Sequence, residues 1–488
     1  MKRRSLCAWA LVPQIALGAC VVGPSYQVPP APTPTSARYK EAGTWKVASP
    51  GDALPRGPWW TMFRQPELDA LQAHLNVNNQ TIAAAFENYL AARALIRAAE
   101  AQYYPTIVFQ PSTSRGRSPG VTGANPSAVT GSSATTGGGI PGPFEAYVLA
   151  GQGSWVPDLF GRVRNNVRGR RYNAQASAAD LESTRLAAQA SLTATYFQLR
   201  GQDALIELLD KTVTANAEIA SITRTRYEAG LENESVVVQA ELTLQAARVQ
   251  ATNAGVLRGE YEHAIAALIG VPPTDFSMPH RALLATPPRI PLGAPSHLLE
   301  RRPDIASAER QMAAANAAVG VGYAAYFPVI TLSGTAGFAT STLSTLFHWP
   351  SRLWSTGLSL AQTIFDGGER RANLDQLYAL YFATVAKYRQ TVLTAFQQVE
   401  DNLTQTRILV DVIEQQRTAV ALAQRGFDLQ RVRYETGLDP YINLMVQQTA
   451  LLSAQQQLVS FQVQQMLATV QLVQALGGGW DRSLLPKE

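Results

Sequence analysis

Two proline-free segments of nearly equal length constrain this chain more than any other feature. They run from about residue 162 to 229 and from about residue 370 to 436. In the second segment, apolar residues recur in alternating steps of four and three, which predicts a coiled-coil seam. A helix of about 65 residues is about 100 Å long, a length that globular domains rarely use. The residues of this seam are Leu374, Tyr378, Tyr381, Val385, Tyr388, Val392, Ala395, Val399 and Leu403.

Each long segment ends in the same motif, R-x-R-Y-E-x-G-L, at 224–231 and again at 431–438. Gly230 and Gly437 suit the position just after a helix, where a left-handed backbone excludes most side chains. The arginines of the motif lie in the last turn, where positive charge suits the helix dipole. The motif therefore predicts that each long helix ends and reverses into an antiparallel partner. The partners are expected at 235–269 and 442–476.

Short strand-like runs precede each long segment, within 104–156 and 326–365. The run ITLSGTAGF, from Ile330 to Phe338, alternates apolar and hydroxyl residues, and WSTGLSLAQ from Trp354 does the same. Weaker patterns cover 106–110 and 146–155. A strand of about 10 residues with one apolar face is a candidate for crossing a membrane, and a soluble sheet is the alternative. Four strands are too few to close a barrel, so several chains would have to share one.

The N-terminus has the features of a targeting segment. MKRR is followed by a short apolar stretch, Leu6–Ala16, which is below the ~20 residues of a membrane-spanning helix. The sequence Leu17-Gly18-Ala19-Cys20 resembles a bacterial lipobox, so we expect cleavage before Cys20, with S-diacylglycerol and N-palmitoyl groups on it. The next residue, Val21, favours sorting to the outer membrane by the same resemblance. An ordinary signal peptide with a chance cysteine is the alternative.

The remaining composition argues against several functions. Charged residues make up only 16% of the chain, and removing the three cations of residues 1–19 from the formal charge of +5 leaves +2. That charge is too small to indicate a nucleic-acid partner. Loss of the segment before Cys20 also leaves a single cysteine, so no intramolecular disulfide can form. The five histidines lack metal-ligand spacing, and GVGYAA at 320–325 lies in an alanine-rich helical run rather than after a strand. We therefore expect no enzyme activity, no metal and no cofactor besides the lipid.

The patterns divide the chain into two similar halves. DLFG at 158–161 and FDGG at 365–368 mark the same strand-to-helix corner in each half. The aromatic residues Trp59, Trp60 and Phe63 are expected to anchor a core at the start of one amphipathic helix that runs toward Ala101. The predicted divisions are a signal peptide (1–19), an acylated linker (20–58), a first repeat of helix, β-hairpin, long helix and helix (59–270), a connector or equatorial region (271–300), a second repeat (301–476) and a tail (477–488).

Several stretches together resemble the TolC-type outer-membrane efflux proteins, and within them the NodT-type lipoprotein branch. The resemblance is carried in order by CVVGPSYQVP (20–29), PWWTMFRQPELDAL (58–71), PDLFGRVRNNV (157–167), LLERRPDIASAERQMAAANAAVGVGYAAYFP (298–328), QTIFDGGERRANL (362–374), the two R-Y-E-x-G-L motifs and ALGGGW (475–480). These stretches span nearly the whole mature chain.

The resemblance implies an α+β membrane protein that works as a homotrimer. Each chain would give four strands to a shared twelve-stranded transmembrane β-barrel and long antiparallel helices to a periplasmic α-barrel. The trimer would be a passive exit duct for small molecules such as drugs and toxic compounds. A proton-driven inner-membrane pump of the RND type and a periplasmic adaptor would deliver them, and iris-like movement of the helix tips would open the duct.

The resemblance also assigns residues to the tip. Those of the periplasmic tip, where adaptors dock, are Arg226, Tyr227, Gly230, Arg433, Tyr434 and Gly437. Asp439 matches an acidic residue that lines the pore constriction, and relatives often carry a second acid where this chain has Val446. We therefore expect weaker cation selectivity or a different seal. The second motif is expected to serve the gate and the first mainly adaptor docking.

Two alternatives remain open at the level of the sequence. A duct of a type I protein secretion system would share the fold, although the lipobox and the RRPD stretch favour efflux of small molecules. A lipid-anchored coiled-coil scaffold without a pore belongs to a different class. It would form no trimer and no conducting channel.

Overall fold

A computed structural model describes residues 21–32, 39–42, 58–118, 142–281, 287–288, 290, 301–480 and 485. The chain forms two compact units, and each unit takes segments from both halves of the sequence. The first consists of the described parts of Met1–Tyr26, Ala94–Arg171 and Ala314–Tyr381. The second consists of the described parts of Gln27–Arg93, Tyr172–Ala313 and Phe382–Glu488.

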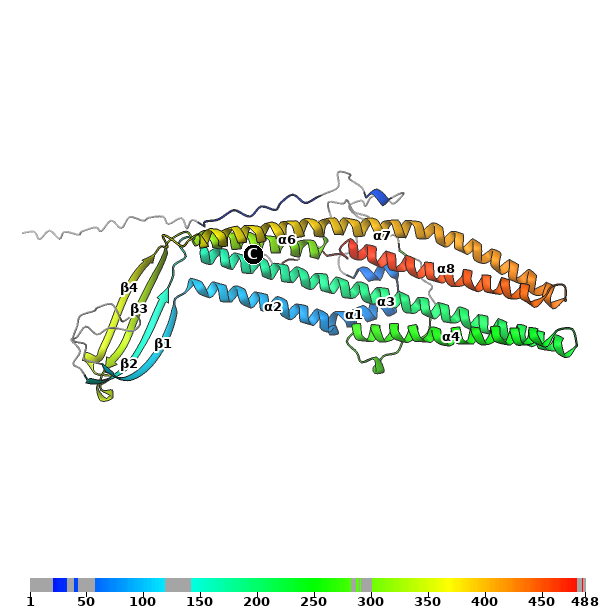
Figure 1. Ribbon diagram of the computed structural model, residues 1–488, viewed down its shortest axis with the longest axis horizontal. Helices are drawn as coiled ribbons and strands as arrows, with labels where there is room; N and C mark the ends of the chain where they lie inside the picture. The colour runs from blue at the N-terminus through cyan, green and yellow to red at the C-terminus, as the bar shows by residue number, and fades with distance from the viewer. Residues whose placement is uncertain are drawn as a thin grey trace, which may run out of the picture. The chain divides into compact units, whose positions relative to one another are not determined.

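Four long helices form two antiparallel hairpins, as the repeated motif predicts. The first hairpin pairs α3 (Arg162–Glu228) with α4 (Glu234–Leu268), and the second pairs α7 (Glu369–Glu435) with α8 (Tyr441–Ala475). In the second unit the two hairpins lie side by side (Figure 1). The predicted seam of α7 is confirmed from Val385 to Leu403, where all its members are buried, whereas its first members, Leu374, Tyr378 and Tyr381, are half-buried.

Each half turns from strand to helix by the same device, an aspartate that caps the following long helix. Asp158 accepts hydrogen bonds from the backbone N–H groups of Val163 and Arg164 at 3.0 and 2.9 Å. Asp366 accepts one from the N–H of Gly368 at 3.0 Å at the start of α7. Such caps satisfy the free N–H groups of a helix start and place negative charge at the positive end of its dipole. The two matching corners predicted from DLFG and FDGG are therefore present.

The strands form one antiparallel sheet in the order β1-β2-β3-β4. Figure 1 shows them as four adjacent arrows. The sequence predicted a first strand of only five residues, and it is longer because backbone pairing with β2 continues through the polar run PSTSRGRS. The bounds are Thr106–Ser118 for β1, Gly142–Trp155 for β2, Val329–Thr340 for β3 and Arg352–Ala361 for β4.

The sheet has one apolar and one polar face, because side chains alternate along each strand and paired residues point the same way. The register aligns Phe109 with Gly151, Ala336 and Trp354. Positions two apart from these share their face, which therefore also carries Leu358. The apolar face comprises Ile107, Phe109, Tyr147, Leu149, Ile330, Leu332, Phe338, Trp354, Leu358 and Leu360. The opposite face is dominated by serine, threonine, glutamine and small residues.

The region after Trp59 corrects one prediction. The single helix expected from Trp59 toward Ala101 is wrong, because the chain forms a 3-10 turn at Trp59–Phe63 and then two helices, α1 (Pro66–Asn78) and α2 (Gln80–Glu100). Arg64 adopts a left-handed φ of 53° before Pro66 starts α1. Asn79 then ends α1 and caps α2 through a 3.0 Å bond from the Ile82 N–H. The three aromatic residues are buried, as the sequence predicted.

The described parts of the predicted linker pack against the body of the protein. Residues 21–32 contain no helix or strand, and within the first unit the side-chain amides of Asn165 and Asn316 donate to the carbonyls of Val22 and Pro24 at 3.1 and 3.2 Å. The region after the predicted connector begins with α6 (Pro303–Ala324), whose first-turn proline occupies a position where a missing N–H costs no helical hydrogen bond. Residues 320–324 of the GVGYAA stretch lie in this helix.

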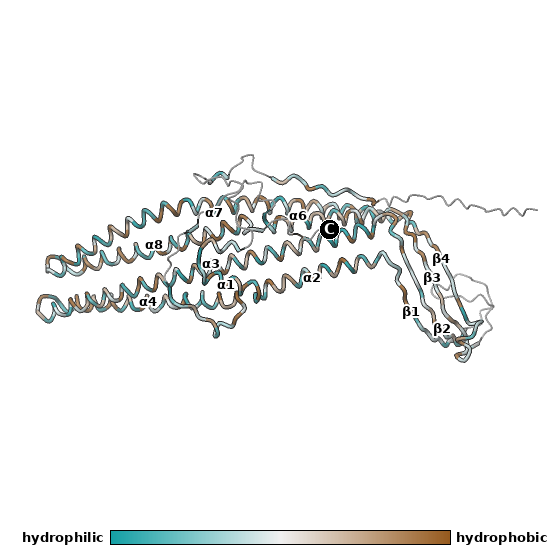
Figure 2. The backbone as a smooth tube through the Cα atoms, turned by 180° about the vertical axis from the view of Figure 1, so that it is seen from behind, coloured by the Kyte–Doolittle hydropathy of each residue, from teal (hydrophilic) through white to brown (hydrophobic). Residues whose placement is uncertain are grey.

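Hydrophobic and polar residues alternate along the helices (Figure 2). Among the described residues, none of the helices is both long and apolar enough to cross a membrane.

Candidate functional site at the ends of the helix hairpins

Both long helices end in the same hydrogen-bonded motif. The N–H of Leu231 donates to the Arg226 carbonyl at 2.9 Å, and the N–H of Gly230 donates to the Tyr227 carbonyl at 2.8 Å. The end of α7 repeats these two bonds through the N–H groups of Leu438 and Gly437. Gly230 and Gly437 have φ of 73° and 76°, the left-handed conformation that the sequence predicted for them.

The ends of the two hairpins are held together by an apolar cluster within one chain. Tyr434 at the end of α7 is 1% exposed, and its ring meets that of Tyr441 at 5.7 Å in an edge-on arrangement. Such aromatic pairs add about 0.5–1.5 kcal/mol to the burial of their surface. The buried members of this cluster, which we call the tip cluster, are Ile219, Ala220, Ala240, Phe427, Tyr434, Tyr441, Leu444 and Leu451.

Arg226 of the first hairpin bonds directly to the second. Its Nη1 donates to the backbone carbonyls of Tyr434 and Glu435 at 3.1 and 3.3 Å, at the negative end of the α7 dipole. Its guanidinium carbon lies 5.2 Å from the centre of the Tyr434 ring. Its Nε lies 3.4 Å from a Glu232 carboxylate oxygen, an ion pair whose geometry is not that of a hydrogen bond. Arg226 was expected to serve the end of its own helix, and the structure places it on the neighbouring one.

Further polar contacts near Arg226 join the first hairpin to the second. The hydroxyls of Thr223 and Tyr434 are 2.8 Å apart, and burial raises the pKa of that tyrosine above its ordinary value. Arg431 forms a salt bridge with Glu218 of the first hairpin at 2.7 Å. The side chains of Asn216 and Gln448 also bond across the two hairpins. The Thr223–Tyr434 and Asn216–Gln448 pairs are buried, so separating them is costly unless water replaces the lost partner, whereas the exposed Arg431–Glu218 pair contributes little.

The two copies of the motif have different surroundings. Tyr227 is 43% exposed, whereas Tyr434 is buried in the tip cluster. Conversely, the Arg226 side chain is 18% exposed and that of Arg433 is 55% exposed. The first copy therefore presents its tyrosine to solvent and uses its arginine to hold the second hairpin. Tyr434 is buried in this arrangement, so it cannot contact an adaptor directly and can affect docking only by positioning the residues that surround it.

Asp439 follows the second motif and is paired within its own hairpin. Its carboxylate forms a salt bridge with Arg433 and accepts a hydrogen bond from the Gln430 side chain at 3.1 Å. The hydrogen bond from the Arg433 guanidinium, followed by that from Gln430, lowers the pKa of Asp439 below its ordinary value. Val446, the position where the resemblance led us to expect a missing second acid, is exposed. The local negative charge at this tip is thus partly balanced by arginine.

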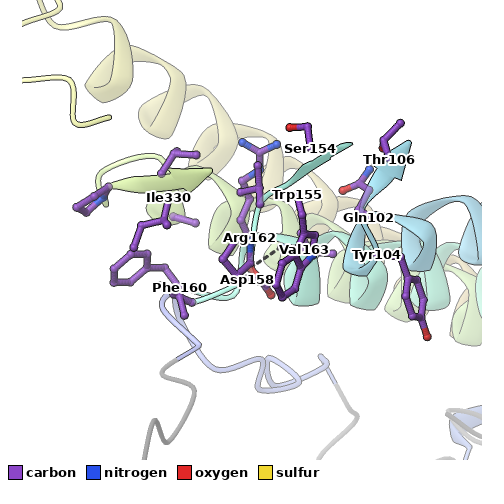
Figure 3. A pocket seen from close by; sticks show the side chains of 16 residues that line it. Gln102, Tyr104, Thr106, Ser154, Trp155, Asp158, Phe160, Arg162, Val163 and Ile330 are labelled. Carbon is purple, nitrogen blue, oxygen red and sulfur yellow. Dashed lines mark hydrogen bonds between the residues drawn. The ribbon is translucent and has the colours of Figure 1, made fainter. Parts of the chain in front are cut away.

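A separate pocket lies in the first unit, where β2 turns into α3. Its volume is about 270 Å³, and Figure 3 shows Trp155, Phe160 and Asp158 among the side chains that line it. The backbone of Val22 donates to the Phe160 carbonyl at 3.3 Å, so the first described residues of the chain are tied to this corner. Cys20 lies outside the described residues. No cluster of histidine, cysteine, aspartate and glutamate that could hold a metal ion occurs in the described part of the chain.

The sequence matches the family model described as outer membrane efflux protein over residues 71–271 and 294–478. The chain belongs to the outer membrane efflux protein family. It is 34% identical over 490 residues to the solvent efflux pump outer membrane protein SrpC of Pseudomonas putida, an alignment that covers 99% of this chain and 100% of the relative. It is 32% identical over 466 residues to the antibiotic efflux pump outer membrane protein ArpC of the same species, covering 95% and 93%.

Solved structures agree with this assignment. The fold matches that of the outer-membrane channel OprN with a TM-score of 0.84 and 27% sequence identity, over 94% of this chain and 100% of that one. The resemblance to TolC-type proteins and the fold of long helices with four antiparallel strands are thereby confirmed. As an outer membrane efflux protein, the chain is a channel of the outer membrane that reaches into the periplasm. It is not an enzyme, and the alternative of a scaffold without a pore is wrong.

Proposed function

We propose that three copies of this chain form one passive exit duct, which receives small molecules from an inner-membrane RND-type pump through a periplasmic adaptor. The observation that carries this proposal is the four-stranded sheet, which is polar on one face, apolar on the other and unpaired at both edges among the described strands. An open edge leaves backbone groups without partners, which a hydrocarbon environment does not tolerate. Three such sheets joined edge to edge give twelve strands and close a ring with threefold symmetry.

Exposed apolar stripes on the helices support the same assembly. On α4, Val238, Leu242, Val249 and Val256 follow one another in steps of four and seven, and each is between 57% and 61% exposed. On α7, Leu422 and Leu429 are seven residues apart and are also exposed. Seven-residue spacing is the pattern of a helix that packs on another helix. Because the described part of one chain leaves these residues exposed, a second copy is the partner that the pattern fits.

The tip supports a gate that opens as the two hairpins separate. The contacts of Arg226, Thr223 and Asn216 all join the first hairpin to the second, and none of them would survive an outward movement of one hairpin. Charge-assisted and buried hydrogen bonds hold such a closed state until a partner offers better contacts. The exposed Tyr227 of the first motif fits an adaptor-docking role. The second motif contributes Tyr434 and Asp439 to the closed gate.

A lipid on Cys20 fits the structure around the following residues. Val21 packs so closely against Gly161 that a Cβ added to this glycine would come within 3.0 Å of the Val21 Cα. Val22 bonds to Phe160 at the same strand-to-helix corner. A diacylglycerol attached to the preceding residue would therefore enter the bilayer next to the sheet. The lipid contributes an anchor, and the duct itself is built from the sheet and the helices.

The relatives named above serve solvent and antibiotic efflux pumps, and we propose the same substrate classes for this chain. A strain lacking the gene should become sensitive to organic solvents and antibiotics, and the wild-type gene should restore resistance. A Cys20→Ser variant should lose palmitate labelling while the trimer still assembles. If susceptibility is unchanged and the strain instead fails to secrete a protein into the medium, the chain is a type I secretion duct.

A further inference from the structure

Arginines and aromatic residues gather at one end of the apolar face of the sheet. This end lies away from the strand-to-helix corners, at the close of β1 and β3 and the start of β2 and β4. Three arginines share the apolar face there, because Arg115 and Arg117 keep the alternation of Phe109, and Arg352 that of Trp354. Arginine on a face that otherwise carries Ile107, Phe109 and Leu358 is unexpected if that face contacts only hydrocarbon.

The loop between β3 and β4 extends the apolar face with aromatic rings. The Phe347 ring packs edge-on against Phe338 of the apolar face, 5.5 Å away. Trp349 lies beneath the Arg352 guanidinium, whose carbon is 3.8 Å from the indole centre. Phe347 and Trp349 are 70% and 74% exposed, so their rings are available to lipid. Exposed aromatic rings at the end of an apolar band are typical of the boundary between hydrocarbon and headgroups.

Two of the three arginines at this end of the sheet, Arg117 and Arg352, are not paired with an acidic side chain among the described residues. Arg115 pairs with Glu145 at 3.2 Å, and Glu145 also accepts a hydrogen bond from the Tyr147 hydroxyl at 3.2 Å. Within the described residues, no acidic side chain pairs with the exposed Arg117 or Arg352. A guanidinium held flat on an indole keeps its N–H groups at the ring edge, where they can bind a phosphate in bidentate fashion.

The position of Arg352 along β4 matches the level of the lipid headgroups. From Leu360 to Arg352 the apolar face runs eight residues, about 27 Å along the strand. At a strand tilt of about 40°, this corresponds to about 20 Å along the membrane normal, close to the ~25 Å of an apolar barrel band. Arg352 and Trp349 therefore lie where hydrocarbon gives way to headgroups, at the side of the membrane opposite to the periplasmic helices.

We propose that Arg352, held in place by Trp349, and Arg117 bind the phosphate groups of the phosphorylated glycolipid in the outer leaflet of the outer membrane. The inference rests on the trimer proposed above, which places β4 of one chain beside β1 of the next. Arg352 on β4 and Arg117 on β1 are then brought toward each other at each junction between subunits. The bound glycolipid spans the junction and stabilises the trimer, which has three such sites.

Native mass spectrometry of the purified full-length protein in detergent tests this proposal. Bisphosphorylated lipid A is titrated against the wild type, an Arg117→Gln/Arg352→Gln variant and a Trp349→Ala variant. An Arg417→Gln/Arg425→Gln variant, which removes two exposed arginines of α7, is the matched control. We expect the double arginine variant to bind about 25-fold more weakly, about fivefold per arginine. Trp349→Ala should also weaken binding, and the control should bind like the wild type.

The ligand controls distinguish the source of the phosphate. Monophosphorylated lipid A should bind more weakly than the bisphosphorylated form, and phosphatidylglycerol or inorganic phosphate should not compete at equal concentration. Equal affinity of wild type and double arginine variant, or full competition by phosphatidylglycerol, would overturn the inference. The same spectra show whether the protein is a trimer. A monomeric wild type would refute the proposed assembly, whereas trimers of unaltered lipid affinity would refute only the lipid site.

Discussion

Replacing Arg226 by alanine should open the duct. Arg226 is the side chain of the first hairpin that bonds to the backbone end of the second, through the carbonyls of Tyr434 and Glu435 at 3.1 and 3.3 Å. A hydrogen bond from a charged donor contributes about 1.5–3 kcal/mol. For the two hydrogen bonds of Arg226 together we use the lower value of about 1.5 kcal/mol, because in the variant the freed Glu435 carbonyl can bind water instead. The cation–π contact with Tyr434 adds about 0.5 kcal/mol at a partly exposed site.

The variant therefore shifts the closed-to-open balance by about 2 kcal/mol per chain, which is about 30-fold. If the three chains open together, the effects multiply. The assay is single-channel recording of purified protein in planar bilayers, with open probability as the readout. A second readout is the sensitivity of cells to a large antibiotic that a closed outer membrane excludes.

Arg224→Ala is the matched control for this experiment. Arg224 belongs to the same motif, but its 60% exposed side chain pairs with Glu241 of its own hairpin and does not reach the second. An exposed pair of this kind contributes about 1 kcal/mol or less. We expect Arg224→Ala to stay closed. Arg226 does not hold the duct closed if Arg226→Ala conducts like the wild type, or if both variants open to the same extent.

Three further outcomes follow from the structure. In Gly230→Ala and Gly437→Ala the new methyl group has room, since nothing lies within 4 Å of the first and the nearest atom to the second is 3.5 Å away. Each variant should therefore lose about 1–2 kcal/mol of folding stability through strain of the left-handed backbone alone. The melting temperature should fall accordingly, and an unchanged melting temperature would contradict this. Because Arg433 lowers the pKa of Asp439, the stabilisation from its carboxylate is present above the ordinary value of 3.8 and is lost only as pH falls through the lower folded value. Wild-type conductance should therefore not change between about pH 5 and 8. The Asp439→Asn variant should show reduced cation selectivity, and unaltered selectivity would count against a pore role for Asp439. Gly320→Ala should free the N-terminal segment for limited proteolysis, because the new Cβ would lie 2.6 Å from the Asn165 amide that holds Val22, and protease resistance equal to wild type would refute this.

The heptad seam shows how far the sequence could predict the site. Steps of seven from Val385 lead through Val392, Val399, Thr406, Ile413, Val420 and Phe427 to Tyr434. All of these residues are buried except Val420, which is half-buried. Continuing the seam past Leu403 would thus have placed Tyr434 in the interior rather than on a docking surface. Asn216 and Thr223, one heptad apart on α3, are buried polar residues that lie outside the repeated motif. The motif therefore could not predict their contacts with the second hairpin.

Other features could not be predicted because they depend on contacts between distant segments. Arg226 has the local signature of a residue that caps its own helix, and only the packing of the two hairpins directs it to α7. The polar end of β1 has no alternating pattern and is a strand because β2 pairs with it. The break at Asn79 depends on its side-chain bond to the Leu268 carbonyl at 2.7 Å. Helix ends and strand-to-helix corners, whose bonds are local, were the features that the sequence predicted best.

The molar mass of the purified protein, determined together with its conductance in planar bilayers, tests whether three chains form one gated duct. We expect a particle of three chains that inserts in discrete steps, with a small conductance that rises when Arg226 is replaced by alanine. A monomer, or a trimer that never conducts in either form, would contradict it.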